Sequence, residues 1–196
     1  MKHAEPAFLV VLYVTIVQAA SQHPASTSQL SDEDRQVIGI TLEQFKGDTS
    51  ALLLDSTVSM CGGEIPALCI RQALLDEIEP AAWIPTDRTA LRNAFAARNR
   101  TPIGLGGLSV EARIVDGAQI RTMFAKGPGW PEVGKKFPGV RHVVQVSAPA
   151  YTADGNRALV YVEARCPGRC GGGSILLLRH LDGRWRVERS LLDWVG

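Results

Sequence analysis

The first half of the chain carries apolar residues at helical spacing, interrupted by short polar segments. The clearest apolar stripe consists of Val37, Ile38, Thr41, Leu42 and Phe45. Ser31 and Asp34 have the spacing of a capping box in its acidic form, and Gly47 follows the last apolar position. Because the cap, the stripe and the terminator agree, the pattern predicts a helix between Ser31 and Gly47.

Two further helices are predicted before residue 100. Residues 68–78 can present one broad apolar face, made of Leu68, Ala73, Leu74, Leu75 and Ile78. Pro80 and Pro85 end this pattern, and either Thr86 or Asp87 can cap the next helix. Along that helix lie Leu91, Ala94, Phe95 and Arg98.

The middle of the chain predicts short strands and loops. Residues 51–54 form a short apolar run that we expect to be a strand, and residues 108–115 alternate with a period of two. Residues 118–124 suit a helical turn. Residues 126–139 contain several Gly and Pro residues and Trp130, which predicts a long ordered loop.

The last third of the chain has the period of a β-sheet. Strand patterns occupy residues 143–146, 158–164, 175–178 and 185–192, and residues 166–173 form a tip loop. Asp154-Gly155 and Asp182-Gly183 are turn signals, because both residue types tolerate the positive φ of a tight hairpin turn. Strands near one another in sequence usually pair, so these segments predict an antiparallel meander.

The order of elements, with helices first and the sheet last, predicts an α+β fold. The N-terminal helices would pack on the C-terminal antiparallel meander and cover its apolar face. Such a helix-covered sheet is compatible with a nuclear-transport-factor-2-like (NTF2-like) or a cystatin-like architecture. Residues 31–196 are expected to form one domain, preceded by a flexible polar tail over residues 22–30.

The first 21 residues predict a secretory signal peptide. Lys2 and His3 precede an apolar stretch over residues 7–17, which is short for a membrane span, and small residues follow it. Cleavage after Ala19 or after Ser21 fits the pattern, and an uncleaved anchor is the alternative. We therefore expect an exported protein, periplasmic or secreted, with no stable membrane anchor once the signal is removed.

The 4 cysteines lie beyond the signal, at Cys61, Cys69, Cys166 and Cys170. An even number of cysteines in an exported chain indicates disulfides, and proximity favours the two local pairs, Cys61–Cys69 and Cys166–Cys170. Other pairings remain open. A zinc site or a redox-active pair is disfavoured, because neither spacing matches the usual ligand or C-x-x-C motifs.

A distinctive order of residues follows position 157: ALVYV at 158–162, Cys166 and Cys170, LLL at 176–178, DGRW at 182–185, and Trp194. This pattern resembles the C-terminal part of a group of exported bacterial proteins for which we know of no established activity. The resemblance implies export and a fold, and it implies no mechanism.

Charge excludes some classes of partner. Lys plus Arg is 21 and Asp plus Glu is 20, so the formal net charge is +1. The charges are interspersed along the chain, which gives no electrostatic footprint for nucleic acid or for an anionic membrane. We expect a protein or small-molecule partner and no nucleic acid.

No catalytic, cofactor-binding or metal-binding motif stands out. Ser147, His142 and Asp55 can be written as a nucleophile, a base and an acid, but no nucleophile elbow supports them. The glycines at 104–107 and 171–173 match no phosphate-binding fingerprint. Trp130 is the best single candidate for a ligand or partner contact, because it lies in the predicted Gly/Pro-rich loop.

Two functions remain from the sequence. The favoured hypothesis is a non-enzymatic binding or interaction module that uses a cavity or rim of the helix-covered sheet. The alternative is a small exported hydrolase or isomerase with carboxylate and histidine catalysis inside that cavity. Clustering of Asp55, His142 and Glu163 around one pocket would favour the alternative.

Overall fold

The computed structural model describes residues 29–60, 69–70, 85–127, 129–168 and 170–195. The helices are α1 (Asp32–Leu42), α3 (Pro85–Arg98), α4 (Gly117–Lys126) and α5 (Trp130–Lys136), with the short 3-10 helix η1 (Glu43–Phe45) after α1. The strands are β1 (Ala51–Leu54), β2 (Ser59–Met60), β3 (Cys69–Ile70), β4 (Arg113–Val115), β5 (His142–Val146), β6 (Ala150–Tyr151), β7 (Arg157–Arg165), β8 (Gly172–Leu181) and β9 (Arg184–Val195).

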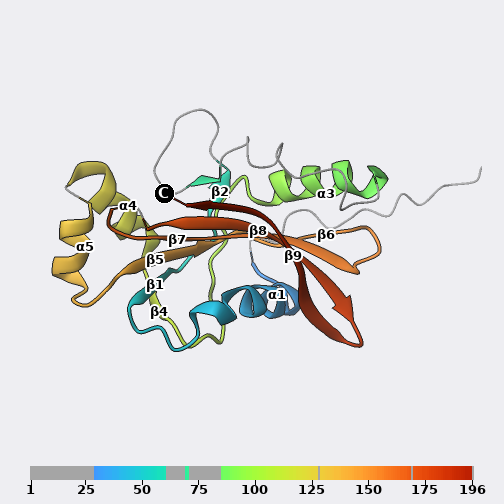
Figure 1. The fold of residues 1–196 in the computed structure, drawn as a ribbon. Helices are drawn as coiled ribbons and strands as arrows, with labels where there is room; N and C mark the ends of the chain where they lie inside the picture. Colours follow the sequence, from blue (N-terminus) through green and yellow to red (C-terminus); the bar gives the residue numbers. More distant parts are fainter. Residues whose placement is uncertain (1–28, 61–68, 71–84, 128, 169, 196) are drawn as a thin grey trace, which may run out of the picture.

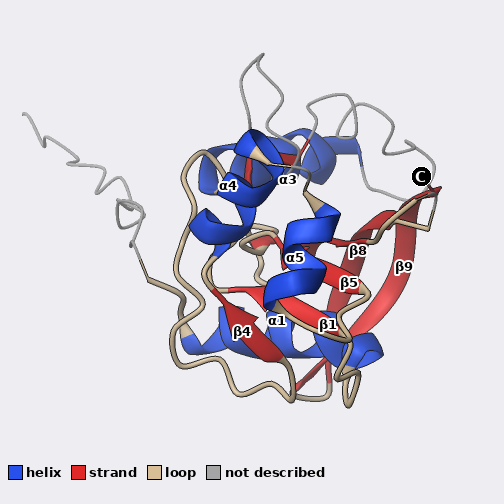
Figure 2. Ribbon diagram, turned by 90° about the vertical axis from the view of Figure 1, so that its left-hand side faces the viewer, coloured by secondary structure: helices blue, strands red, loops and turns tan. Residues whose placement is uncertain are grey.

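A 7-stranded mixed sheet forms the centre of the protein, with the order β4-β1-β5-β7-β8-β9 and with β6 beside β7. Helix α1 lies on one face, and α3, α4 and α5 lie on the other (Figures 1 and 2). Ala51 and Leu53 of β1 join the apolar core on the α1 face, whereas Leu52 joins the core beneath α4 and α5. This architecture confirms the predicted α+β class, while the NTF2-like or cystatin-like assignment stays a prediction.

Helix α1 begins as its sequence predicts. The Ser31 side chain accepts a hydrogen bond from the Asp34 N–H, and the Asp34 carboxylate accepts one from the Ser31 N–H, which completes the capping box. The helix tightens into η1 and the chain then turns at Gly47, whose φ is 75°. Leu30, which we expect in the flexible tail, is instead buried in the core on the α1 face.

The predicted meander is confirmed. Strands β5, β7, β8 and β9 pair antiparallel in sequence order. Asp182 and Gly183 both have positive φ, 51° and 74°, so the β8–β9 hairpin turns where the Asp-Gly signal places it. Cys166 and Cys170 form a disulfide in the connection between β7 and β8, as predicted.

Strand β1 is also confirmed, but its pairing extends the sheet beyond the meander. It pairs parallel to both β4 and β5. All of its residues are buried, which is typical of a strand with neighbours on both sides and helices on both faces. Parallel strands need long crossover connections, and α4 and α5 supply the one between β4 and β5.

Two predictions for residues 103–139 need correction. The expected strand over 108–115 is reduced to β4, because the chain bends at 111–112 and its alternation changes phase: Ile114 is 43% exposed and Val115 is buried. The expected loop over 126–139 contains the helix α5. Its Pro131 stands in the first turn, where the missing N–H has no partner to lose, and Gly129 with φ 69° makes the entry.

The other predicted helices have different outcomes. Helix α3 confirms the one predicted over 86–98, and α4 extends the predicted turn over 118–124 into a helix capped by Asp116. The helix predicted over 68–78 is wrong for Cys69–Ile70, which form β3 parallel to β2. Its remaining residues, together with the signal segment and most of the tail, lie outside the described residues.

Candidate functional site

An open groove of about 1040 Å³ lies on the α1 face of the sheet, and we call it the α1 groove. One wall is α1 with η1, another is the segment 109–112, and the start of β9 also lines the groove. Its lining consists of Arg35, Gln36, Gly39, Ile40, Leu42, Glu43, Phe45, Lys46, Ala51, Leu53, Ser109, Val110, Glu111, Ala112, Val144, Gly183, Arg184, Trp185, Arg186 and Val187.

The floor of the α1 groove is apolar. Leu53 of β1 and Val144 of β5 contribute buried side chains from the middle of the sheet. Trp185 of β9 lines the groove while only 3% of it is exposed, and its ring lies 5.0 Å from that of His180 and 5.8 Å from that of Tyr151. Because it is packed against these two rings, Trp185 forms a rigid aromatic surface at one end of the groove floor.

The rim of the α1 groove carries charged side chains of both signs. Its walls contribute Arg35 and Lys46 as well as Glu43 and Glu111. Arg184 and Arg186 of β9 also border the groove, but they alternate with Trp185, which packs in the core on the α1 face, so their side chains lie on the other face of the sheet. Lys46 Nζ lies 3.9 Å from Glu111 Oε1, and both side chains are more than half exposed, so this contact holds the two walls only weakly. Arg35 Nη1 likewise lies 3.1 Å from Oδ1 of the exposed Asp32. Because exposed pairs of this kind are weak, Arg35 and Lys46 stay available to an anionic group next to the apolar floor.

Gly39 stands in the middle of α1 and lines the groove. A Cβ placed on it would meet nothing within 4 Å, and its φ is not in the positive region. Neither a close contact nor a special backbone conformation therefore requires glycine here. Since a glycine in a helix interior costs about 1 kcal/mol relative to alanine, the position keeps space open at a cost in stability.

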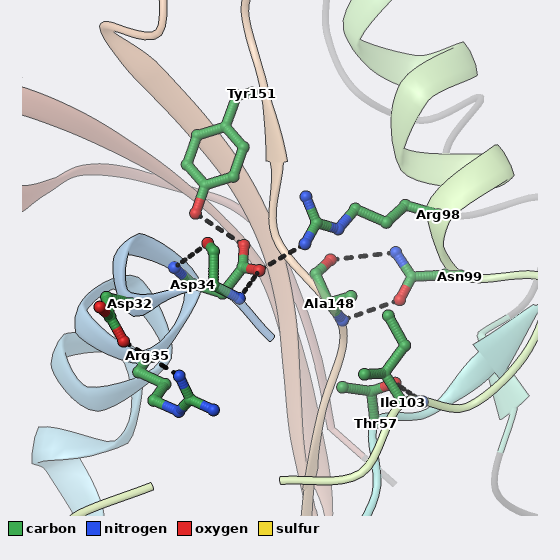
Figure 3. Close-up of polar contacts among 10 residues, drawn as sticks. Asp32, Asp34, Arg35, Thr57, Arg98, Asn99, Ile103, Ala148 and Tyr151 are labelled. Carbon is green, nitrogen blue, oxygen red and sulfur yellow. Dashed lines mark hydrogen bonds and ion pairs between the residues drawn. The ribbon is translucent and has the colours of Figure 1, made fainter. Parts of the chain in front are cut away.

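A buried ionic contact fixes the N-terminal end of α1 (Figure 3). The Asp34 side chain is fully buried, and its carboxylate accepts hydrogen bonds from the Arg98 guanidinium of α3 and, at 2.9 Å, from the Tyr151 hydroxyl of β6. Burial and the neighbouring Asp34 charge raise the pKa of Tyr151 far above its ordinary value. This contact ties the groove wall to elements distant in sequence.

Asn99 makes the neighbouring polar contact shown in Figure 3. Its fully buried amide accepts from the Ala148 N–H at 2.8 Å and donates to the Ala148 carbonyl at 3.0 Å. The side chain thus acts as a strand partner for the backbone between β5 and β6. Thr57 similarly accepts from the Ile103 N–H at 2.9 Å. These contacts satisfy buried backbone groups that have no place in the sheet ladder.

Glu163 is buried on the opposite face of the sheet from α1. Its carboxylate accepts hydrogen bonds from the Gln145 amide, the Tyr161 hydroxyl and the Arg165 guanidinium. Both carboxylate oxygens accept hydrogen bonds, and these bonds join β7, which carries Glu163, to Gln145 of the neighbouring strand β5. The arrangement is that of a satisfied structural carboxylate, which stabilises the sheet between two apolar clusters.

The candidate catalytic residues do not come together. Asp55 follows β1 and accepts a hydrogen bond from the Gly117 N–H at 3.0 Å, whereas His142 pairs with Ala51 at the opposite end of β1. Glu163 lies on the face away from the α1 groove. None of these residues lines the groove, so the structure does not assemble the Asp55, His142 and Glu163 site of the enzymatic alternative.

His142 and Ser147 take part in local contacts. His142 Nδ1 lies 3.6 Å from Asp48 Oδ2. Hydrogen bonds from the Ser50 hydroxyl and N–H, at 2.6 and 2.8 Å, hold the pKa of Asp48 below its usual value. Ser147 is buried, and its Oγ accepts from the Tyr161 N–H at 2.8 Å, so it serves as a backbone partner rather than as an exposed nucleophile.

Trp130 begins α5 and packs edge to face on Phe124 of α4, with 5.3 Å between ring centroids. It is half-buried against the core beneath α4 and α5. The contacts of Trp130 are thus those of a packing residue, and a ligand or partner contact at this side chain stays a prediction. The predicted Cys61–Cys69 disulfide lies outside the described residues.

Neither a metal cluster nor a membrane-spanning helix occurs among the described residues. No three His, Cys, Asp or Glu side chains within them converge on a point that could hold a metal ion. Nor does any helix among them have the length and apolar character needed to cross a bilayer.

The α1 groove could not be found from sequence, with one exception. Its lining is scattered from residue 35 to residue 187 and meets only in the tertiary fold. Gly39 is the exception, because a glycine inside a strong helical pattern is a visible irregularity that often has a packing or functional reason.

The C-terminal resemblance to exported bacterial proteins stays an expectation from the sequence. Comparison of the chain with family models, with curated proteins and with solved structures finds no match in any of the three.

Proposed function

We propose that this protein is an exported, non-enzymatic binding module that takes an apolar small molecule with an anionic group into the α1 groove. Its volume of about 1040 Å³ is slightly above the usual size of small-molecule sites, which measure roughly 300–1,000 Å³. The apolar floor would hold the body of the ligand, and Arg35 and Lys46 on the rim would hold its charged group.

Gly39 is the observation that carries the proposal. A side chain at this position would project into the α1 groove, and nothing in the protein would be displaced by it. A helix that retains glycine under these conditions is less stable than it could be, and stability lost at a groove wall is typical of a binding site. An unused surface depression would give no reason to keep that position empty.

Fluorescence of an anionic apolar dye, anilinonaphthalene sulfonate, tests the site directly. We expect the folded protein to enhance the dye's emission and Gly39→Leu to remove most of that enhancement, because the leucine fills the groove. Gly134→Leu is the matched control: it is also a helical glycine at which an added Cβ would meet nothing within 4 Å, but it lies in α5, away from the groove.

Displacement of the dye tests the ligand class. Dodecanoate should displace it more effectively than dodecanol, because only the carboxylate can pair with Arg35 and Lys46. Equal binding of the dye by Gly39→Leu and the parent protein, with near-ultraviolet circular dichroism unchanged, would exclude the α1 groove as the site. Equal displacement by the acid and the alcohol would refute the anionic part of the proposal.

Export is supported by the Cys166–Cys170 disulfide, because disulfides persist mainly in oxidising compartments. The mass of the protein recovered from a periplasmic or secreted fraction tests this. A chain shortened by the predicted signal, with its cysteines oxidised, is the expected result. A full-length chain with free thiols would refute export.

A further inference from the structure

Strand register brings arginines from three strands together at the free end of the β8–β9 hairpin. Arg157 of β7 lies opposite Arg179 of β8, and Arg179 lies opposite Arg186 of β9. Arg184 lies opposite Leu181, and Arg189 lies opposite Leu177, two residues before Arg179. Since cross-strand partners and alternate residues share a face, these side chains form one surface, which we call the arginine face.

The arginine face lies on the side of the sheet away from α1. Arg157 shares its face of β7 with Leu159 and Tyr161, which pack under α3, so the arginines continue that face beyond the helix. The hairpin end projects past α1 at the lower right of Figure 1. Arg179, Arg184, Arg186 and Arg189 are exposed, and Leu181 among them is 38% exposed.

Positive charge on the arginine face is poorly compensated. Like charges directly opposite each other destabilise a sheet, and Arg157, Arg179 and Arg186 are consecutive partners. Glu188 neutralises part of this charge, with its Oε2 3.5 Å from Arg157 Nε. Within the described part of the chain, no ion pair to Arg179, Arg184, Arg186 or Arg189 is found.

We propose that the arginine face docks on an anionic phospholipid surface, with guanidinium groups on lipid phosphates and Leu181 in the interfacial layer. Arginine is suited to phosphate because its planar donors can bind two oxygens at once. Cationic residues beside an exposed apolar side chain are the composition of interfacial membrane contacts. This docking does not depend on occupancy of the α1 groove.

A bilayer fits this surface better than an acidic protein does. A stable protein interface uses roughly 20–30 residues on each side, whereas the arginine face is a small projecting end of one hairpin. Lipid headgroups are laterally mobile and can match arginines that a β-bulge spaces unevenly along β9. The formal net charge of +1 does not predict such a surface, because the acidic residues of the whole chain balance its basic residues in number. The local cluster of arginines arises only from strand register.

Co-sedimentation of the full chain with vesicles tests the proposal. We expect binding to vesicles of equal parts phosphatidylglycerol and phosphatidylcholine, weaker binding in high salt, and little binding to phosphatidylcholine alone. Arg184→Gln combined with Arg186→Gln should weaken binding roughly thirtyfold, from a typical contribution of each basic residue near an anionic surface. Leu181→Gln should weaken it in low and high salt alike.

Arg100→Gln combined with Arg141→Gln is the matched control, because it removes the same charge from exposed positions outside the hairpin. Every variant carries the same N-terminal segment, so any binding of vesicles by that segment is common to all variants and does not contribute to the differences between them. Equal loss in the control pair would show a general charge effect and overturn the proposal. The proposal is also overturned if the folded protein does not bind the vesicles, or if it binds polyglutamate more tightly than vesicles and this binding depends on the hairpin arginines.

Discussion

Replacement of Asp34 by asparagine should strongly destabilise the fold, because the carboxylate joins α1, α3 and β6. The side chain is fully buried and accepts from the Ser31 N–H at 2.8 Å, from the Tyr151 hydroxyl at 2.9 Å and from Arg98. Asparagine keeps the size but replaces one acceptor oxygen with a donor that faces other donors. The Arg98 charge then loses its partner.

The magnitude follows from these contacts. Removing one partner of a buried ion pair costs about 3–5 kcal/mol, and the lower end applies because the Arg98 side chain is 29% exposed and can reach water. Weakening the capping box adds about 1 kcal/mol. We therefore expect Asp34→Asn to lower the free energy of unfolding by about 4 kcal/mol and Tm by roughly 8–16 °C.

Urea denaturation of Asp34→Asn, Arg98→Met and the double variant measures this directly. Arg98→Met removes the charge that Asp34→Asn leaves unpaired, so the double variant should be less destabilised than the sum of the single variants by about 1–3 kcal/mol. Additivity to within about 0.5 kcal/mol would show that the two side chains are not coupled. A cost below about 1 kcal/mol for Asp34→Asn would refute its role as a buried anchor.

Three further predictions concern other described residues. Gly39→Ala should raise the free energy of unfolding by about 1 kcal/mol, because helix propensity improves and no contact is crowded; a decrease in urea denaturation would show that the space is not open. The raised pKa of Tyr151 keeps its hydroxyl neutral in the folded protein, so its contribution to the free energy of unfolding is complete below the unfolded pKa of about 10 and is lost as pH rises above it. The Tm of Tyr151→Phe should therefore fall less steeply with alkaline pH than the Tm of the parent protein. Identical slopes of Tm against pH would contradict this. Replacing Cys166 and Cys170 with serine should cost about 2 kcal/mol, the entropy of a short closed loop, and a reductant should then no longer affect Tm through this bridge.

Local chemistry made several elements of the fold predictable from the sequence. Ser31 and Asp34 meet within one helical turn, so the start of α1 depends on no distant residue. Asp182 and Gly183 adopt positive φ at low cost, which sets the turn of the β8–β9 hairpin. The antiparallel meander and the Cys166–Cys170 bridge likewise join segments that are close along the chain.

Non-local packing decided what the periodic pattern could not. The short helix α5 has too few residues for a clear stripe, and it forms because Val133 and Phe137 are buried against α4 and the sheet. Strand β1 is hydrophobic throughout, which indicates burial but not the direction of its neighbours. Its parallel pairing requires two crossover connections: the segment that contains α3 leads from β1 to β4, and α4 and α5 lead from β4 to β5.

The sequence by itself determined that the protein has an α+β fold with a capped helix, tight hairpins and a local disulfide. It did not locate a site, and the residues that it offered for catalysis lie at opposite ends of β1 or on opposite faces of the sheet. Only the tertiary structure assembled the α1 groove and the arginine face. The physical reason is that groove walls and strand register depend on contacts between segments far apart in sequence, whereas caps and turns depend on neighbours.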